Sequence, residues 1–151
     1  MSSLKIRIQA KEQLLHLMQA DRVILSFPVS TSRFGLGETE GSFRTPTGRF
    51  RIHEKIGAKH PVNTVFRGRV PVPDPPDWAR AEDLITSRIL WLDGLEDHNA
   101  NTRERYIYIH GTNQEQLIGA AASRGCIRMR NQDVIQLFDL IDVGTEVEIL
   151  P

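Results

Sequence analysis

The chain has 151 residues and a mass of 17.1 kDa, which is the size of one globular domain that can bury a core without covalent staples. Nineteen Lys and Arg residues balance nineteen Asp and Glu residues, so the molecule lacks the net positive charge that attracts nucleic acids and anionic membranes. The hydrophobic content of 40% and charged content of 25% exclude a collagen-like, disordered or coiled-coil chain. The single cysteine, Cys126, excludes an intramolecular disulfide, and Cys and His do not recur at a structural zinc spacing.

The amino-terminal residues 1–8 lack the continuous apolar stretch of a secretory signal, and no run approaches the ~20 apolar residues of a membrane span. We therefore expect one domain over residues 1–151 and a cytoplasmic location, or a periplasmic one if a signal segment was removed ahead of Met1. We expect no metal, no organic cofactor, and no nucleic-acid, membrane or obligate protein partner.

The first thirty residues predict two strands and a short helix. Residues 4–8 alternate apolar and polar side chains as a half-buried strand does, whereas Leu14, Leu17 and Met18 repeat at helical spacing. Residues 22–29 indicate a buried strand. Because Pro28 cannot donate a backbone hydrogen bond, it must lie at the end of that strand or the strand must lie at a sheet edge.

Two irregular segments follow. Residues 30–48 carry four glycines and are too rich in turn formers for regular structure, so we expect a loop near the functional site. Phe50 and Ile52 resume a strand alternation. Residues 56–80 hold five prolines and predict an excursion over the surface, with a flap that covers substrate as an open alternative.

The second half of the chain predicts the centre of the sheet. Residues 88–93 and 105–109 are β-rich runs, closed by Gly94 and by Gly111. We expect Asn131 to be the N-cap of a helix that ends at Gly144, and residues 147–149 to form a last strand. Without a βαβ rhythm, this order predicts an α+β, mainly β domain: one curved or folded sheet with two short helices.

His110 and Cys126 are the residues best suited to chemistry. His110 ends a predicted strand, and Cys126 lies sixteen residues later, within reach if a hairpin brings the two together. The imidazole would then take the thiol proton and hold an ion pair that lowers the thiol pKa. Gly125 leaves the backbone free to turn amides toward an oxyanion, and Arg128 suits a substrate carboxylate. Either residue alone would be better explained as a buried thiol or a structural histidine.

These residues lie in a longer pattern. It consists of His-Gly-Thr at 110–112, Ser-Arg-Gly-Cys-Ile-Arg-Met at 123–129, Asn131 and Asp133, with further likeness at 29–31, 45–52 and 89–92. The pattern resembles the L,D-transpeptidase catalytic domain, also called the YkuD domain, over roughly residues 22–150. The resemblance implies a β-sandwich-like fold.

The resemblance also implies roles for the catalytic residues. Cys126 would be the nucleophile and His110 its base. The main-chain carbonyl of Gly111 would orient the imidazole ring, and the amides of Gly125 and Cys126 would form an oxyanion hole.

Three further residues are expected to face substrate. Ser123 would brace the loop there, and Arg128 would bind substrate or form a structural ion pair, two readings that we weigh equally. Arg124 stands where most family members have a second histidine, so a permanent cation replaces an imidazole and could grip a substrate carboxylate.

By resemblance, the substrate is a peptidoglycan tetrapeptide or muropeptide, cleaved at its L,D bond through a thioester on Cys126. An L,D-carboxypeptidase that releases terminal D-alanine in peptidoglycan recycling is favoured. An L,D-transpeptidase that crosslinks stems, and an inactive domain that binds peptidoglycan fragments, remain as alternatives. The order and spacing of His110 and Cys126 disfavour papain-like and sortase enzymes.

Overall fold

One continuous β-sheet dominates the computed structural model, which describes residues 4–151. The strands of the described chain are β1 (Leu4–Gln9), β2 (Leu14–Gln19), β3 (Arg22–Ser30), β4 (Gly48–Ile56), β5 (Val65–Arg67), β6 (Val70–Pro71), β7 (Ile85–Gly94), β8 (Tyr108–Gly111), β9 (Ile127–Met129) and β10 (Glu146–Leu150). The helices are α1 (Asn131–Leu140) and two 3₁₀ turns, η1 (Asp97–Asn99) and η2 (Glu115–Leu117).

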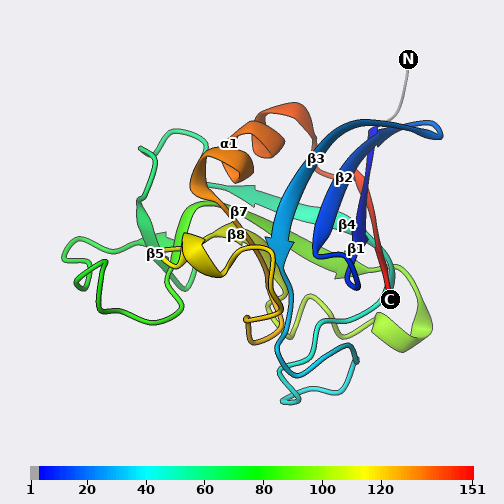
Figure 1. The fold of residues 1–151 in the computed structure, drawn as a ribbon, viewed down its shortest axis with the longest axis horizontal. Coiled ribbons are helices and arrows are strands. Elements are labelled where there is room, and N and C mark those ends of the chain that lie inside the picture. The colour runs from blue at the N-terminus through cyan, green and yellow to red at the C-terminus, as the bar shows by residue number, and fades with distance from the viewer. Residues whose placement is uncertain (1–3) are drawn as a thin grey trace.

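The sheet closes on itself. Its strand order is β4-β10-β1-β2-β3-β9-β8-β7-β5-β6, and an additional pairing of β4 with β7 leaves only β5 and β6 outside the closed part. Most neighbours are antiparallel, but β1 and β10 run parallel, as do β8 and β9. The predicted mainly β fold is confirmed, and its architecture is barrel-like or sandwich-like. Figure 1 shows the β2–β3 strands at one side of the molecule and the β5 region at the other.

The core fills the inside of the closed sheet. Ile6, Leu15 and Phe50 are fully buried there, and Val134 and Phe138 of α1 belong to the same cluster. Helix α1 packs against β7 and β8, so it supports the strand that carries His110.

The helix predicted at residues 14–18 is wrong, because this segment forms β2. Leu15 and Leu17 point into the core at the two-residue period of a strand, and Leu14 and Met18 lie on the opposite face. Apolar residues on both faces imitate helical spacing. Pairing with β1 on one side and β3 on the other satisfies the backbone of this segment, so tertiary context decides its conformation.

Other boundaries also move. β3 is not buried throughout, since Val23 and Ile24 are 52% and 40% exposed and β9 pairs only with Val29 and Ser30 at the far end. The second central strand begins at Tyr108 rather than at residue 105. In the described chain α1 is the one α-helix, not one of two.

The two irregular segments behave differently. Residues 31–47 remain a loop apart from isolated bridges, as expected, whereas Ser30 ends β3 and Gly48 begins β4. The excursion at 56–80 contains the short β5–β6 hairpin, which pairs with β7. No helix among residues 4–151 is long and apolar enough to cross a membrane.

Candidate active site

Two neighbouring parallel strands bring His110 and Cys126 together. Ile109 of β8 lies opposite Ile127 of β9. His110 directly follows Ile109 and Cys126 directly precedes Ile127, so the pairing of the two strands brings His110 near Cys126. Both side chains line one cavity of about 70 Å³. The remaining lining residues are Asp83, Ile85, Ser123 and Arg124.

The ring of His110 is held in one orientation. His110 is 1% exposed, and its Nδ1 lies 2.5 Å from the carbonyl oxygen of Gly111. Because a carbonyl can only accept, Nδ1 carries the proton and Nε2 is left as the acceptor. Burial lowers the pKa of His110, which favours the neutral ring that a general base requires.

Gly111 is glycine for a steric reason. A Cβ at this position would lie 2.5 Å from Asn131 Oδ1 and 2.5 Å from the carbonyl oxygen of Thr86. Asn131 in turn accepts hydrogen bonds from Thr86 Oγ1 at 2.5 Å and Ser87 Oγ at 2.6 Å, and its Nδ2 donates to the carbonyl of Thr112. Asn131 therefore joins α1, β7 and the segment after His110, a role that its expected N-cap position did not reveal. It is the first residue of α1, and Arg130 is the N-cap.

The sulfur of Cys126 contacts the backbone of the chain just before β8 and at its start. The amide of Tyr108 donates to Sγ at 3.4 Å, and the thiol donates to the carbonyl of Tyr106 at 3.4 Å. Burial raises the pKa of the thiol to about 11. With the lowered pKa of His110, the resting pair is a neutral thiol and a neutral imidazole, so the expected lowering of the thiol pKa is wrong for the free protein.

The turn before the sulfur is tied down by Ser123. Its hydroxyl donates to the carbonyl of Cys126 at 2.6 Å and accepts from the amide of Gly125 at 3.2 Å. Gly125 has a φ of +123°, which strongly favours glycine. Thr45 Oγ1 donates to the Gly125 carbonyl at 2.9 Å. In the free protein the Gly125 amide is therefore bound by Ser123 rather than directed at an oxyanion.

Arg128 forms a structural ion pair, one of its two expected roles, with a partner that sequence reasoning did not identify. Its guanidinium donates to Asp83 Oδ1 at 2.6 Å and to Gln114 Oε1 at 3.1 Å. The side chain is only 3% exposed, and its buried Nε has no hydrogen-bond partner within the described residues. No motif of the sequence includes Asp83, which lies directly after the proline-rich excursion. Arg128 thus has a structural partner and also lines a cavity of about 300 Å³ next to the cysteine.

Arg124 lies where three cavities meet. It lines the cavity of Cys126 and His110, the larger cavity of Arg128, and a third of about 280 Å³ that includes Phe43 and Tyr106. Arg124 is exposed, and its side chain makes no hydrogen bond or ion pair within residues 4–151. Its charge is available to a ligand in any of the three.

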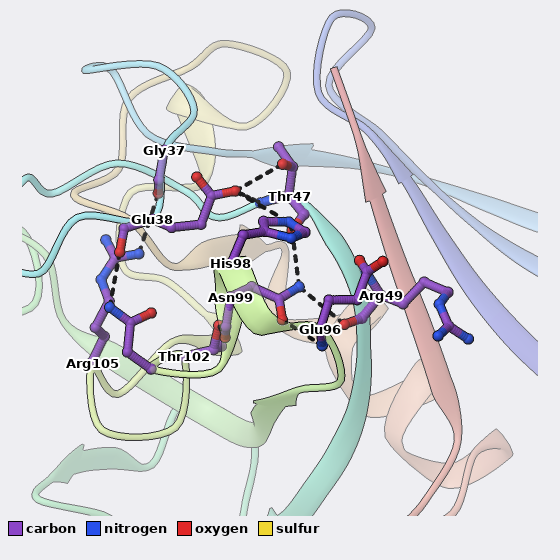
Figure 2. Close-up of polar contacts among 10 residues, drawn as sticks. Gly37, Glu38, Thr47, Arg49, Glu96, His98, Asn99, Thr102 and Arg105 are labelled. Atoms are coloured by element: carbon purple, nitrogen blue, oxygen red, sulfur yellow. Dashed lines mark hydrogen bonds and ion pairs between the residues drawn. The ribbon is translucent and has the colours of Figure 1, made fainter.

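The glycine-rich loop is anchored by hydrogen bonds to the segment at residues 98–105. Thr47 offers its carbonyl to His98 and Asn99 and its hydroxyl to Glu38, and the Arg105 guanidinium donates to the carbonyl of Gly37 (Figure 2). The same guanidinium donates to the Arg44 carbonyl at 2.6 Å. Through the hydrogen bond from Thr45, this anchored loop supports the turn at Gly125, so the loop lies near the site, as expected.

Other candidates lie outside the catalytic cavity. None of the other four histidines lines it, and neither does any residue of 56–80, although Asp83 and Ile85 directly after that excursion do. Trp78 lines a separate cavity. Across residues 4–151 no group of three or more His, Cys, Asp and Glu side chains could hold a metal ion.

Comparison with known proteins places the chain in a family. The model of the L,D-transpeptidase catalytic domain, YkuD, matches residues 4–149, which extends the resemblance beyond the expected start at residue 22. A Bacillus licheniformis protein that carries the name L,D-transpeptidase YkuD is 31% identical over 147 residues, covering 97% of this chain and 66% of its own. A Bacillus subtilis protein named as an L,D-transpeptidase, YqjB, is 38% identical over 104 residues, covering 68% of this chain and 50% of its own.

Solved structures agree in fold. The L,D-transpeptidase from Xylanimonas cellulosilytica superposes with a TM-score of 0.66 at 18% identity, over 99% of this chain and 61% of that one. An L,D-transpeptidase from Mycobacterium smegmatis gives a TM-score of 0.63 at 17% identity, over 99% of this chain and 59% of that one. The chain therefore spans about half to two thirds of these relatives. From the family match over nearly its whole length, we conclude that the chain belongs to the L,D-transpeptidase catalytic domain (YkuD) family.

Proposed function

We propose that the protein is a cysteine acyl-transfer enzyme that cleaves the L,D bond of peptidoglycan tetrapeptide stems. The observation that carries this proposal is the shared cavity of Cys126 and His110, in which the Gly111 carbonyl leaves the imidazole Nε2 as an acceptor. Family membership supports peptidoglycan as the substrate class.

The neutral resting pair defines the order of the proton transfers. In the free protein the thiol points to the Tyr106 carbonyl, so the S–H bond must rotate toward His110 when substrate enters. His110 Nε2 then takes the proton as sulfur bonds to the carbonyl carbon of the third stem residue. The carbon–nitrogen bond breaks, His110 returns the proton to the amine of D-alanine, and a thioester on Cys126 remains.

Two arginines support recognition of an anionic stem peptide. Arg124 is exposed at the mouth of the catalytic cavity and has the charge to hold a terminal carboxylate. Arg128 lines the adjoining cavity, although Asp83 and Gln114 bind its two terminal nitrogens. We assign Arg124 to the D-alanine carboxylate and Arg128 to the body of the stem.

Water is the acceptor that we favour, which makes the enzyme an L,D-carboxypeptidase. A grip on the free D-alanine carboxylate by Arg124 suits trimming of tetrapeptides. A second candidate, the L,D-transpeptidase, has its own support: Glu40 and Glu104 line the third cavity, and carboxylates there would attract an amine acceptor.

The first experiment tests catalysis. Purified protein is incubated with a tetrapeptide stem, and mass spectrometry follows the loss of one alanine. Cys126→Ala and His110→Ala should abolish release, whereas His16→Ala, on β2 and outside the cavity, should retain it. Full activity in Cys126→Ala would refute the mechanism. Binding without any turnover by the unmodified protein would favour the inactive binding domain.

The second experiment identifies the acceptor. Release of alanine with water alone supports the carboxypeptidase, and product that forms only when a second stem or a free D-amino acid is added supports the transpeptidase. Glu104→Gln separates the two further, because it should slow aminolysis and leave hydrolysis unchanged.

A further inference from the structure

The separate cavity lined by Trp78, here called the second cavity, borders the loop after His110 on the side away from the cavity of Arg128. It has a volume of about 400 Å³. Within residues 112–117, Gln114 and Leu117 line the cavity of Arg128, whereas Asn113, Glu115 and Gln116 line this second one. The same short loop therefore separates the second cavity from the one beside the catalytic residues.

The chemistry of this cavity is amide-rich and includes one aromatic ring. Trp78 lines it and is half-buried, and the side-chain amides of Asn63, Gln116 and Gln132 make no hydrogen bond to any residue of 4–151. Each free amide offers both a donor and an acceptor. No Lys or Arg is among the residues that line it, so the cavity is not suited to a phosphate or an anionic peptide.

Other residues of the cavity are already satisfied and provide rigidity. Asn113 Nδ2 donates to the carbonyls of Trp78 at 3.0 Å and Ala81 at 2.6 Å, and its Oδ1 accepts from the amide of Leu84. Asn113 thus ties the backbone of Trp78 to the loop that follows His110. The indole is held at the cavity by its backbone, while its ring is absent from the hydrophobic clusters of the core.

We propose that this cavity binds an N-acetylated sugar. An aromatic ring can pack on the apolar face of a pyranose, and neutral amides can pair with its hydroxyls and its acetamido group. Resting on the proposed function, the sugar is the glycan end of the peptidoglycan fragment whose stem reaches Cys126. A separate saccharide would present the same chemistry, and the experiments below distinguish the two sources.

The binding experiment needs no turnover. Triacetylchitotriose is titrated into the whole protein and followed by calorimetry and by ligand-observed NMR. Trp78→Ala should lower the affinity about tenfold or more, and Trp78→Phe should retain part of it. Gln136→Ala, which changes an exposed amide of α1 outside the cavity, is the matched control and should bind as the unmodified protein does. Absence of saturable binding, or equal affinity in Trp78→Ala, would overturn the proposal.

The kinetic experiment identifies the source of the sugar. The ratio of kcat/KM for a disaccharide tetrapeptide to that for the sugar-free tetrapeptide should exceed one and fall toward one in Trp78→Ala. Binding of the trisaccharide without this preference would support the site and assign it to a separate saccharide. If neither tetrapeptide is turned over, the proposed function fails while the calorimetry still decides whether the sugar site exists.

Discussion

Asp83→Asn tests how far a single carboxylate sustains the buried guanidinium of Arg128. The Arg128 side chain is 3% exposed, and its 2.6 Å bond to Asp83 is one of two bonds that its terminal nitrogens make. Asparagine keeps the shape and a neutral acceptor but removes the charge. The change therefore leaves a buried cation with neutral partners only.

The magnitude follows from the exposure of the two partners. A hydrogen bond to a charged group contributes about 1.5–3 kcal/mol, and the bond from the guanidinium to a neutral amide oxygen lies at the lower end of that range, so the two bonds differ by about 1.5 kcal/mol at most. The Asp83 side chain is 36% exposed, so water screens part of the difference. We expect a loss of about 1 kcal/mol in the free energy of unfolding, which lowers Tm by about 2–4 °C in a domain of this size.

Urea unfolding at pH 7 measures this loss. The matched control is Asp93→Asn, whose partner Arg51 is 53% exposed at 3.2 Å, and it should cost no more than about 0.5 kcal/mol. High salt should reduce the effect of the control and leave most of the effect at Asp83. Equal losses in the two variants, or an Asp83→Asn protein as stable as the unmodified one, would refute the buried ion pair as a stabilising contact.

Four further outcomes are expected. Gly111→Ala should cost about 2–3 kcal/mol in urea unfolding, because the added Cβ meets backbone and amide oxygens at 2.5 Å; an unchanged midpoint would contradict this. Alkylation of Cys126 by iodoacetamide should rise with pH toward about 11, with about one thiol in 10⁴ ionised at pH 7, and a plateau below pH 7 would instead show an ion pair with His110. The same raised pKa makes the unfolded thiol lose its proton first, so stability should fall between about pH 9 and 11, and Cys126→Ala should remove that loss. Ser123→Ala should slow alanine release and cost about 1–2 kcal/mol, and wild-type rates would exclude the loop contact.

Local pattern was sufficient for the regular parts of the fold. Residues 4–8 and 147–149 alternate on one half-buried face, and both became strands, β1 and β10. The apolar face of α1 was equally readable, with Val134 and Phe138 buried as its spacing indicates. Residues 14–18 failed this test, because apolar side chains on both faces of β2 give the same spacing as a helix and only pairing with β1 and β3 resolves it.

The amino-acid sequence by itself determined which groups can react: one thiol, one histidine at the end of a strand, a glycine before the cysteine and the motif that marks the family. Only the tertiary structure decided their state. Parallel pairing of β8 and β9 places His110 and Cys126 in the lining of one cavity. Burial there raises the pKa of Cys126 and lowers the pKa of His110. Asp83, distant in sequence, became the partner of Arg128 for the same reason, since contacts between remote segments and their desolvation are properties of the packed chain and not of any local pattern.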